Sequence, residues 1–493
     1  MKSTKCPWRC GDGYVSVWRA MRLLPFLVIL SGLSGLANSV RLVGESEIGN
    51  GNNATVTWLT EESDSEPYIG SNEKDEVRLY CSDENPLDSS TLRDDHIDHW
   101  HIPDILIQSE SNLPYNGTVA FGPLINMRVT CQIIFWKYNS TGQDQHLPLF
   151  PSNAHKLTVG RGPLQPMQAH LSLTADPSVV YLTWVSSYVS NYNPSVWYHE
   201  SAQPGAVSTS QAGATTYAAG DMCGAKAVRV EGQHFRDPGA IYSAALANLK
   251  PATNYSYWFG IDKANTGGMS PVHWFLSPKL SASNAHIVAT ADMGAWGGSN
   301  PKVDEWQSPI PTIMQRILTV SDTKPVDLVA IYGDLSYANG EGHVWERYFY
   351  RLEPVATRIP LHVAIGNHEY DYDRLPAHSQ HRDPSGVVTA YQPPWGNLNG
   401  DSSQGECAVP VAKRFRMPVS PGSNGVFWYS HNVANVHMVV ISTEHDVSPS
   451  SVQAKWLESD LAAVNRTRQP WVIVGGHRSL YNDVQYTYPD PDL

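Results

Sequence analysis

The clearest pattern of hydrophobic positions lies in residues 285–493, where short apolar runs alternate with stretches of helical periodicity. This alternation predicts an α/β domain. The runs at 286–291, 326–332, 361–365, 436–441 and 471–474 are the expected strands. Helices are expected over 342–352 and 449–464. In the second helix, one face collects Val452, Trp456, Leu457, Leu461 and Val464, and Ser448 stands in the N-cap position ahead of Pro449.

Two earlier regions show a different pattern, with short alternating runs separated by turn residues. Residues 41–160 contain strand-like runs at 54–58 and 129–136 between acidic, Ser-rich loops, which predicts a small β domain to which we assign no chemistry. Residues 161–280 contain such runs at 179–185, 240–246 and 255–259, which predicts a β-sandwich. Within this second region, the segment 249–257 resembles fibronectin type III domains.

The first forty residues read as a leader rather than as part of the fold. Arg19 and Arg22 precede an apolar core at 23–36, and the small residues Ala37 and Ser39 follow it. This order is typical of a cleaved secretory signal, with an uncleaved anchor as the alternative. Because a membrane span needs about 20 apolar residues, we expect no stable span. We therefore expect a protein that is secreted, extracellular or held at the cell surface.

Composition narrows the classes of function. The chain of 493 residues is 41% hydrophobic, which excludes a disordered protein. It carries 34 Lys and Arg against 47 Asp and Glu, a net charge of −13. Since phosphate backbones select basic surfaces, nucleic acid is not expected as a partner.

Glycan acceptors and cysteines agree with export. Asn-x-Ser/Thr triplets occur at Asn53, Asn116, Asn139, Asn254 and Asn465. Beyond the leader there are four cysteines, Cys81, Cys131, Cys223 and Cys407, which allow three sets of disulfide pairings. We favour Cys81 with Cys131 inside one domain and Cys223 with Cys407 between domains, with free buried thiols as the alternative.

Chemistry-bearing side chains follow four of the five strands expected after residue 285. The first strand is followed by Asp292, the second by Asp334 and Tyr337, the third by Asn367 and His368, and the fifth by His477. Open α/β sheets place their sites at the carboxyl ends of strands, so these groups should converge. Oxygen and imidazole donors of this kind suit di- or trivalent metals.

These positions resemble a known family. The blocks Asp292-x-Gly294, Gly333-Asp334-x-x-Tyr337, Gly366-Asn367-His368-Glu369 and Val474-x-x-His477 are similar to four of the five signature blocks of purple acid phosphatases, members of the metallophosphoesterase superfamily. Further matches at 221–224, 237–239, 405–407 and 442–446 resemble the large plant-type forms. The resemblance implies a fibronectin type III-like β-sandwich at 161–280 followed by a metallophosphoesterase α/β sandwich at 285–493.

The resemblance also implies the roles of these residues. Asp292, Asp334 and Tyr337 would hold Fe(III), and phenolate-to-iron charge transfer would give a purple colour. Asp334, Asn367 and His477 would hold a second, divalent metal, which is iron, zinc or manganese. His368 would act as general acid toward a phosphate ester. Asn367, His368 and Arg478 would contact the phosphate, although an ion pair or a supporting role fits Arg478 equally well.

One departure from the family pattern changes the expectation. The fifth block, Gly-His-x-His, would supply one histidine to each metal, and no such motif occurs in the sequence. We therefore expect an incomplete catalytic domain. The predicted function is a secreted, glycosylated acid phosphatase acting on phosphate monoesters. The alternatives are a phosphodiesterase or nucleotide pyrophosphatase on the same scaffold, and a catalytically inactive surface or binding protein.

Overall fold

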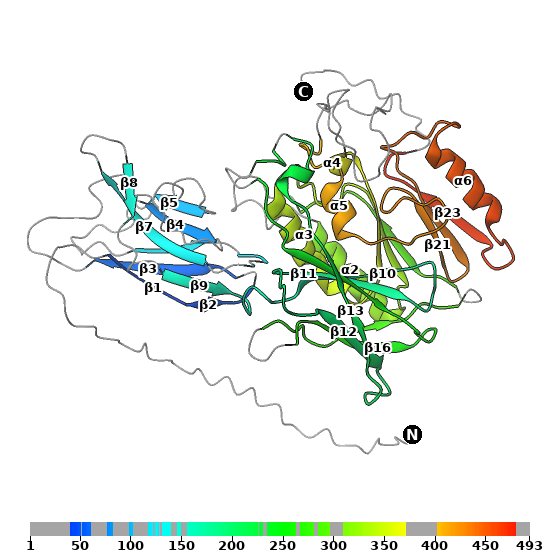
Figure 1. Cartoon of the computed structure of the whole chain (residues 1–493), viewed down its shortest axis with the longest axis horizontal. Helices are drawn as coiled ribbons and strands as arrows, with labels where there is room; N and C mark the ends of the chain where they lie inside the picture. The colour runs from blue at the N-terminus through cyan, green and yellow to red at the C-terminus, as the bar shows by residue number, and fades with distance from the viewer. Residues whose placement is uncertain are drawn as a thin grey trace, which may run out of the picture.

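The computed structural model describes residues 40–50, 52–60, 76–81, 98–101, 117–121, 124–126, 128, 131–139, 145–148, 155–224, 226–229, 234–262, 267–280, 284–295, 309–370 and 402–479. The expected leader, Asn116 and the residues after 479 lie outside this part. Figure 1 shows the first nine strands at one end of the long axis and the last helix with its sheet at the other. No helix in the described ranges is long and apolar enough to cross a membrane.

The first region is a β-sandwich. One sheet has the strand order β1-β3-β6, with β1 (Val40–Gly44), β3 (Ala54–Thr60) and β6 (Gly117–Phe121). The other has the order β2-β9-β7-β4-β5, with β2 (Glu47–Ile48), β9 (His155–Val159), β7 (Cys131–Asn139), β4 (Glu76–Cys81) and β5 (Asp98–His101), and β8 (Gln145–Pro148) pairs with β7. Alternate residues such as Val56, Trp58, Val77 and Leu79 face inward and form its core.

The second region is also a sandwich, as the sequence predicted. The sheet β10-β11-β15-β14 consists of β10 (Met167–Leu173), β11 (Val180–Ser186), β15 (Ala240–Leu246) and β14 (Gly213–Thr215). The sheet β13-β12-β16-β17 consists of β13 (Ser208–Gln211), β12 (Ser195–Glu200), β16 (Asn254–Gly260) and β17 (His273–Leu276). Aromatic side chains fill the space between the sheets, with the rings of Trp184 and Phe259 5.2 Å apart.

The third region is the expected α/β domain. Strands β18 (Ile287–Thr290), β19 (Leu328–Tyr332) and β20 (Leu361–Ala364) form a parallel sheet. A second sheet has the order β21-β22-β23, with β21 (Tyr429–Val433), β22 (Val436–Val440) and β23 (Trp471–Gly475). The helices are α2 (Ile310–Thr323), α3 (Gly342–Ala356), α4 (Asn367–Tyr370), α5 (Val409–Arg414) and α6 (Val452–Ala463). Helix α3 packs on α2 and on β10 of the preceding domain, so this domain and the second sandwich share an interface.

Helix α6 corrects two details of the sequence prediction. It starts at Val452, and its N-cap is Ser451, whose hydroxyl accepts a hydrogen bond from the Ala454 amide at 3.0 Å, so the predicted Ser448 cap is wrong. Its apolar stripe is not all buried, since Val452 is 63% and Leu461 40% exposed. Gln453 is buried instead, because its side-chain amide bonds the Ser442 amide and carbonyl at 2.7 and 2.9 Å.

A disulfide joins Cys223 to Cys407, which is one of the two favoured pairings. Cys131 is also disulfide-bonded. Its cross-strand neighbour in the register of β4 and β7 is Cys81, the partner that the sequence favours, whose side chain lies outside the described residues. Of the glycan acceptors, Asn53, Asn254 and Asn465 are exposed, and Asn139 ends strand β7.

Candidate metal centre

The predicted ligands are held on short connections directly after strands. Asp292 follows β18, Asp334 and Tyr337 follow β19, Asn367 opens α4 after β20, and His477 follows β23. Three of these residues adopt left-handed backbone conformations, with φ of 53° at Asp292, 48° at Asp334 and 54° at Tyr337. Few non-glycine residues adopt this conformation, and such strain concentrates at functional sites.

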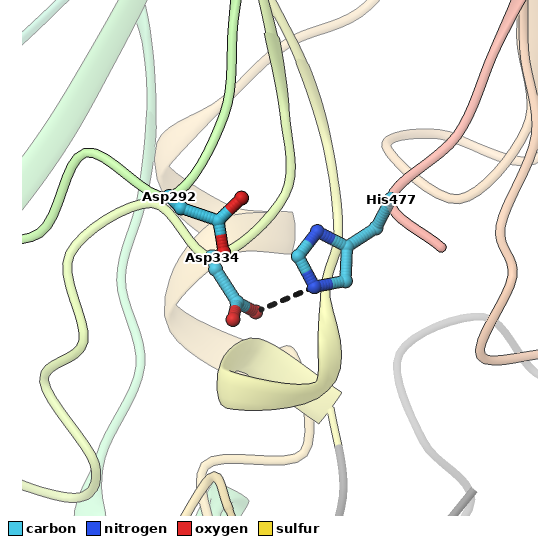
Figure 2. A group of neighbouring side chains, drawn as sticks. All are labelled: Asp292, Asp334 and His477. Carbon is cyan, nitrogen blue, oxygen red and sulfur yellow. Dashed lines mark ion pairs between the residues drawn. The ribbon is translucent and has the colours of Figure 1, made fainter. Parts of the chain in front are cut away.

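The ligand atoms of Asp292, Asp334 and His477 converge, since one atom from each lies within 4.8 Å of the other two. Figure 2 shows the two carboxylates turned toward the same space, with the His477 ring entering from the opposite side. The Nε2 atom of His477 lies 3.3 Å from Oδ1 of Asp334. Three chain segments far apart in sequence thus meet at one point, as the positions of the strand ends predicted.

His477 is oriented by the hydrogen bond on the other side of its ring. Its Nδ1 lies 3.0 Å from the carbonyl oxygen of Tyr332, so Nδ1 carries the proton and donates. This leaves Nε2 directed at Asp334 and at Oδ1 of Asn367, which is 3.1 Å away. Burial lowers the pKa of His477, but the hydrogen bond and charge of Asp334 outweigh burial and raise it to about 9. Opposing effects act on the pKa of Asp334. Burial raises it, but the hydrogen bond and charge of His477 outweigh burial and bring it below its usual range.

Tyr337 and His368 complete the cluster. The Tyr337 hydroxyl donates to Oδ1 of Asp292 at 2.8 Å, and its ring centroid lies 4.3 Å from that of His368. Burial and the neighbouring carboxylates raise the pKa of Tyr337 far above its usual value, which favours the neutral phenol where no metal is bound. The His368 amide donates to Oδ1 of Asp334 at 3.0 Å, and its Nδ1 lies 2.8 Å from Oδ1 of Asn339.

Two glycines leave room for these groups. A Cβ atom at Gly366 would stand 2.2 Å from Oδ1 of Asp334, and one at Gly333 would stand 2.7 Å from the His477 ring. Both distances are far inside van der Waals contact, so these positions admit only glycine with the ligands where they are. Steric exclusion by Asp334 and His477 therefore explains why glycine occupies these positions in the two sequence blocks.

Glu369, the last residue of the third sequence block, holds the loop after β19. Its buried carboxylate accepts hydrogen bonds from the amides of Asp334 and Leu335, each at 2.8 Å, and from Gly366 at 3.0 Å. Burial and the charge of Asp334 raise the pKa of Glu369 to about 8. Asn339 was missed, because a single Asn after Tyr337 gives no pattern that separates it from a turn residue.

Arg478, a predicted phosphate contact, is bound to residues outside the set of predicted ligands. Its guanidinium forms an ion pair with the buried carboxylate of Glu444, through Nε at 2.8 Å and a second nitrogen at 3.0 Å. Its amide donates to the Thr443 hydroxyl at 3.2 Å. Contact of Arg478 with a substrate stays a prediction.

The donor set fits a metal centre. Two carboxylates and one imidazole nitrogen converge, a phenol contacts one of the carboxylates and an amide oxygen contacts the imidazole; hard cations prefer such donors. A hydrogen bond from Nδ1 to a backbone carbonyl, as His477 makes, is the usual way in which a histidine presents Nε2 to a metal.

Comparisons with known proteins agree with this geometry. Residues 166–277 match the family model described as the purple acid phosphatase N-terminal domain, and residues 285–493 match that of the calcineurin-like phosphoesterases. The fold is similar to that of a purple acid phosphatase from yellow lupin seeds, with a TM-score of 0.64 at 24% identity over 90% of this chain and 73% of that one.

Two curated relatives illustrate the range of the family. A protein of Arabidopsis thaliana named probable inactive purple acid phosphatase 9 is 32% identical over 74% of this chain and 56% of its own length. A nucleotide pyrophosphatase/phosphodiesterase of Hordeum vulgare is 28% identical over 47% of this chain and 58% of its own length. The chain spans about half the length of the curated relatives it matches.

The two family models together account for both domains that follow residue 165, in the expected order. Residues of the sequence blocks that resemble this family are also the ones that meet in space. The chain belongs to the plant-type purple acid phosphatases of the metallophosphoesterase superfamily.

Proposed function

We propose that this protein is a secreted phosphatase that hydrolyses phosphate monoesters at a dinuclear metal centre. The observation that carries the proposal is the convergence of Asp292, Asp334 and His477 within 4.8 Å at the ends of β18, β19 and β23. Membership of a phosphoesterase family supports a phosphate ester as the substrate.

The residues divide between two metal positions. Asp292, Asp334 and Tyr337 would hold Fe(III), while Asp334, Asn367 and His477 would hold a divalent iron, zinc or manganese ion, with Asp334 shared. Bound metals would supply charge stabilisation for the phosphoryl oxygens and an activated water. Within the described residues, His477 is the one imidazole of this donor set.

His368 is suited to protonate the leaving group. Its Nδ1 is held by Oδ1 of Asn339, which leaves Nε2 on the Asp334 side, 3.8 Å from that carboxylate. Burial lowers the pKa of His368 below its usual value, although the charge of Asp334 opposes the shift. A lowered pKa makes the imidazolium a stronger acid, which suits protonation of a leaving group.

Two other functions have support of their own. The barley relative named nucleotide pyrophosphatase/phosphodiesterase favours phosphodiester or pyrophosphate bonds as substrates on the same scaffold. The Arabidopsis relative named probable inactive favours a surface or binding protein without turnover. Secretion is proposed from the leader sequence, and exposed Asn53, Asn254 and Asn465 are proposed glycan sites.

The test is metal analysis of purified full-length protein together with assays on p-nitrophenyl phosphate, bis(p-nitrophenyl) phosphate and a nucleoside diphosphate. We expect close to two metals per chain and a preference for the monoester. Preference for either of the other substrates would favour the second function. Bound metal without turnover would favour the inactive protein, and less than one metal per chain would refute the dinuclear centre.

Colour gives an independent check on the ferric position. Tyr337→Phe should remove the visible absorption band of the iron-loaded protein, because the phenolate that transfers charge to iron is absent. A band that persists unchanged would refute Tyr337 as an iron ligand. Thr290→Ser, a mild change on β18, serves as the control that retains the colour.

A further inference from the structure

The N-terminal sandwich contributes a buried arginine to the catalytic domain. Arg128, which is 7% exposed, forms a bidentate ion pair with Glu346 on α3, with Nη1 to Oε2 at 2.7 Å and Nη2 to Oε1 at 3.1 Å. Nη2 also donates to the carbonyl of Asp237 in the second sandwich. One side chain thus binds both other domains.

Asn126 adds a second anchor from the same loop. It is fully buried, and its Nδ2 donates to the backbone carbonyl of Glu346 at 2.9 Å. The backbone amide of Asn126 donates to Oδ1 of Asn50 at 2.7 Å, which ties the loop back to the N-terminal sandwich. Its carbonyl accepts from Arg128 and Arg236 at 3.3 and 3.4 Å.

The far side of Glu346 is closed by the catalytic domain and the second sandwich. Arg414 of α5 lies 3.4 Å from Oε1 of Glu346, and its Nη1 donates to the side chain of Gln168 at 2.5 Å. Gln168 in turn donates to Oε2 of Glu346. Burial alone would raise the pKa of Glu346, but the charges of Arg128, Arg414 and Arg236 lower it, so the carboxylate is ionised.

Glu346 stands one turn inside the N-terminus of α3, directly after the loop that carries two predicted ligands. That loop, residues 333–341, presents Asp334 and Tyr337, and its end is tied to α3 through Glu406. The Glu406 carboxylate accepts from the Gly340 amide at 3.1 Å and from the indole of Trp345 at 3.1 and 3.2 Å. Trp345, the neighbour of Glu346 in α3, and the end of the loop thus share the Glu406 carboxylate.

We propose that Arg128 is a positioning residue, by which the N-terminal sandwich clamps the start of α3 and so fixes the loop that presents Asp334 and Tyr337. The N-terminal sandwich is then a structural part of the catalytic unit rather than a separate binding module. The planar guanidinium bonds both carboxylate oxygens and the Asp237 carbonyl at once, which a lysine ammonium cannot do in this geometry.

Hydrogen exchange of the metal-free full-length protein tests the clamp without depending on the proposed hydrolysis. In Arg128→Met, amides of 335–348 should exchange about tenfold faster or more, while those of α6 stay as protected as in the wild type. In a Glu346→Gln background, Arg128→Met should add less than about twofold, because the path through Glu346 is already broken. Wild-type protection of 335–348 in a folded Arg128→Met protein would overturn the proposal.

Two further variants keep the test decisive. Arg416→Met is the matched control, since Arg416 also bridges domains, over the Tyr181 ring at 3.8 Å, but is exposed; it should leave 335–348 unchanged. If Arg128→Met also loses protection in α6, the variant has unfolded globally. The milder variant Arg128→Lys, which keeps the positive charge, then tests the clamp in its place. Faster exchange of 335–348 with intact α6 supports the clamp, and unchanged exchange of both refutes it.

A metal titration separates this inference from the proposed function. Titrated with Zn²⁺ alone, Arg128→Met should bind about tenfold more weakly than the wild type, with Arg416→Met unchanged. A wild-type protein that binds no metal refutes the dinuclear centre, while the exchange result still decides the clamp. Equal affinity of wild type and Arg128→Met would refute the link between clamp and metal loop.

Discussion

Two clusters of charged side chains in this protein are assembled from distant parts of the chain, and they differ in how the charge is balanced. At the domain junction, the carboxylate of Glu346 lies between Arg128 at 2.7 Å and Arg414 at 3.4 Å. At the metal centre, the Asp334 carboxylate lies near two imidazoles, with Nε2 of His477 at 3.3 Å and Nε2 of His368 at 3.8 Å. The junction is thus balanced by permanently charged guanidinium groups, and the metal centre by imidazoles that can lose their charge.

The difference teaches that burial alone does not decide what a charged cluster does. Glu346, Glu369 and Glu406 are all buried to within 2% of full burial. Arginine charges lower the pKa of Glu346 in spite of burial, whereas burial raises that of Glu369 and of Glu406 to about 8. Arginine partners keep Glu346 ionised where it joins the domains, whereas Glu369 and Glu406, which accept from neutral amide and indole donors, favour the protonated form.

The largest expected effect is at the metal centre. Asp334→Asn should abolish metal binding, because the substitution removes the carboxylate shared by both positions. Metal retained after dialysis, measured by plasma mass spectrometry, reports the loss. Asp176→Asn, which changes an exposed surface carboxylate, is the control and should keep the wild-type metal content. Normal metal content in Asp334→Asn would remove the contrast between the two clusters.

The next effect is at the junction. Glu346→Gln leaves Arg128 and Arg414 buried without their counter-ion, and loss of one partner from a buried ion pair costs about 3–5 kcal/mol of unfolding free energy. Denaturant unfolding at neutral pH measures it. A loss below about 1 kcal/mol would show that the junction resembles a surface ion pair.

A smaller, pH-dependent effect is expected at Glu406, which is buried with neutral donors. Its pKa is raised by burial from 4.5 to about 8, so the folded state holds its proton at pH values where the unfolded state has lost it. Its contribution to stability is therefore largest at acidic pH and falls as the pH rises from about 4.5 to 8, by at most about 1.4 kcal/mol per pH unit.

Glu406→Gln should remove that part of the slope. Unfolding free energies of wild type and variant, compared at several pH values from 5 to 8, measure the difference. Glu369 shifts in the same direction, so the wild-type slope alone does not isolate Glu406. Parallel profiles would mean that Glu406 is ionised in the folded protein, as Glu346 is.

The smallest effect is expected at the surface. Glu200→Gln repeats the chemical change of Glu346→Gln in the exposed pair with Lys250, whose ammonium lies 2.6 Å from Glu200. Solvent screens such a pair, so the thermal unfolding midpoint should stay within experimental error. A clear shift of the midpoint would mean that burial is not what makes the Glu346 ion pairs more stabilising than this surface pair.

Much of the fold was predictable because its signals are local. The expected strands at 286–291, 361–365 and 471–474 correspond to β18, β20 and β23 within two residues at each end. The candidate ligands were found because each follows a strand directly. Helix α6 shows the limit of prediction from local patterns. The 3.6-residue period located its apolar residues. It did not predict that Gln453 is buried against Ser442 while Leu461 is exposed, because packing partners outside the helix decide this.

The sequence by itself determined the order of domains, the strand ends that carry Asp292, Asp334 and His477, and the family to which these blocks point. Only the tertiary structure decided that Asn339 holds His368, that Glu369 holds the loop after β19, and that Arg128 reaches Glu346 across 218 residues. The physical reason is that periodicity and turn chemistry act over a few residues. A buried polar group instead takes whichever partner the fold brings within hydrogen-bonding distance, and no local pattern marks that partner.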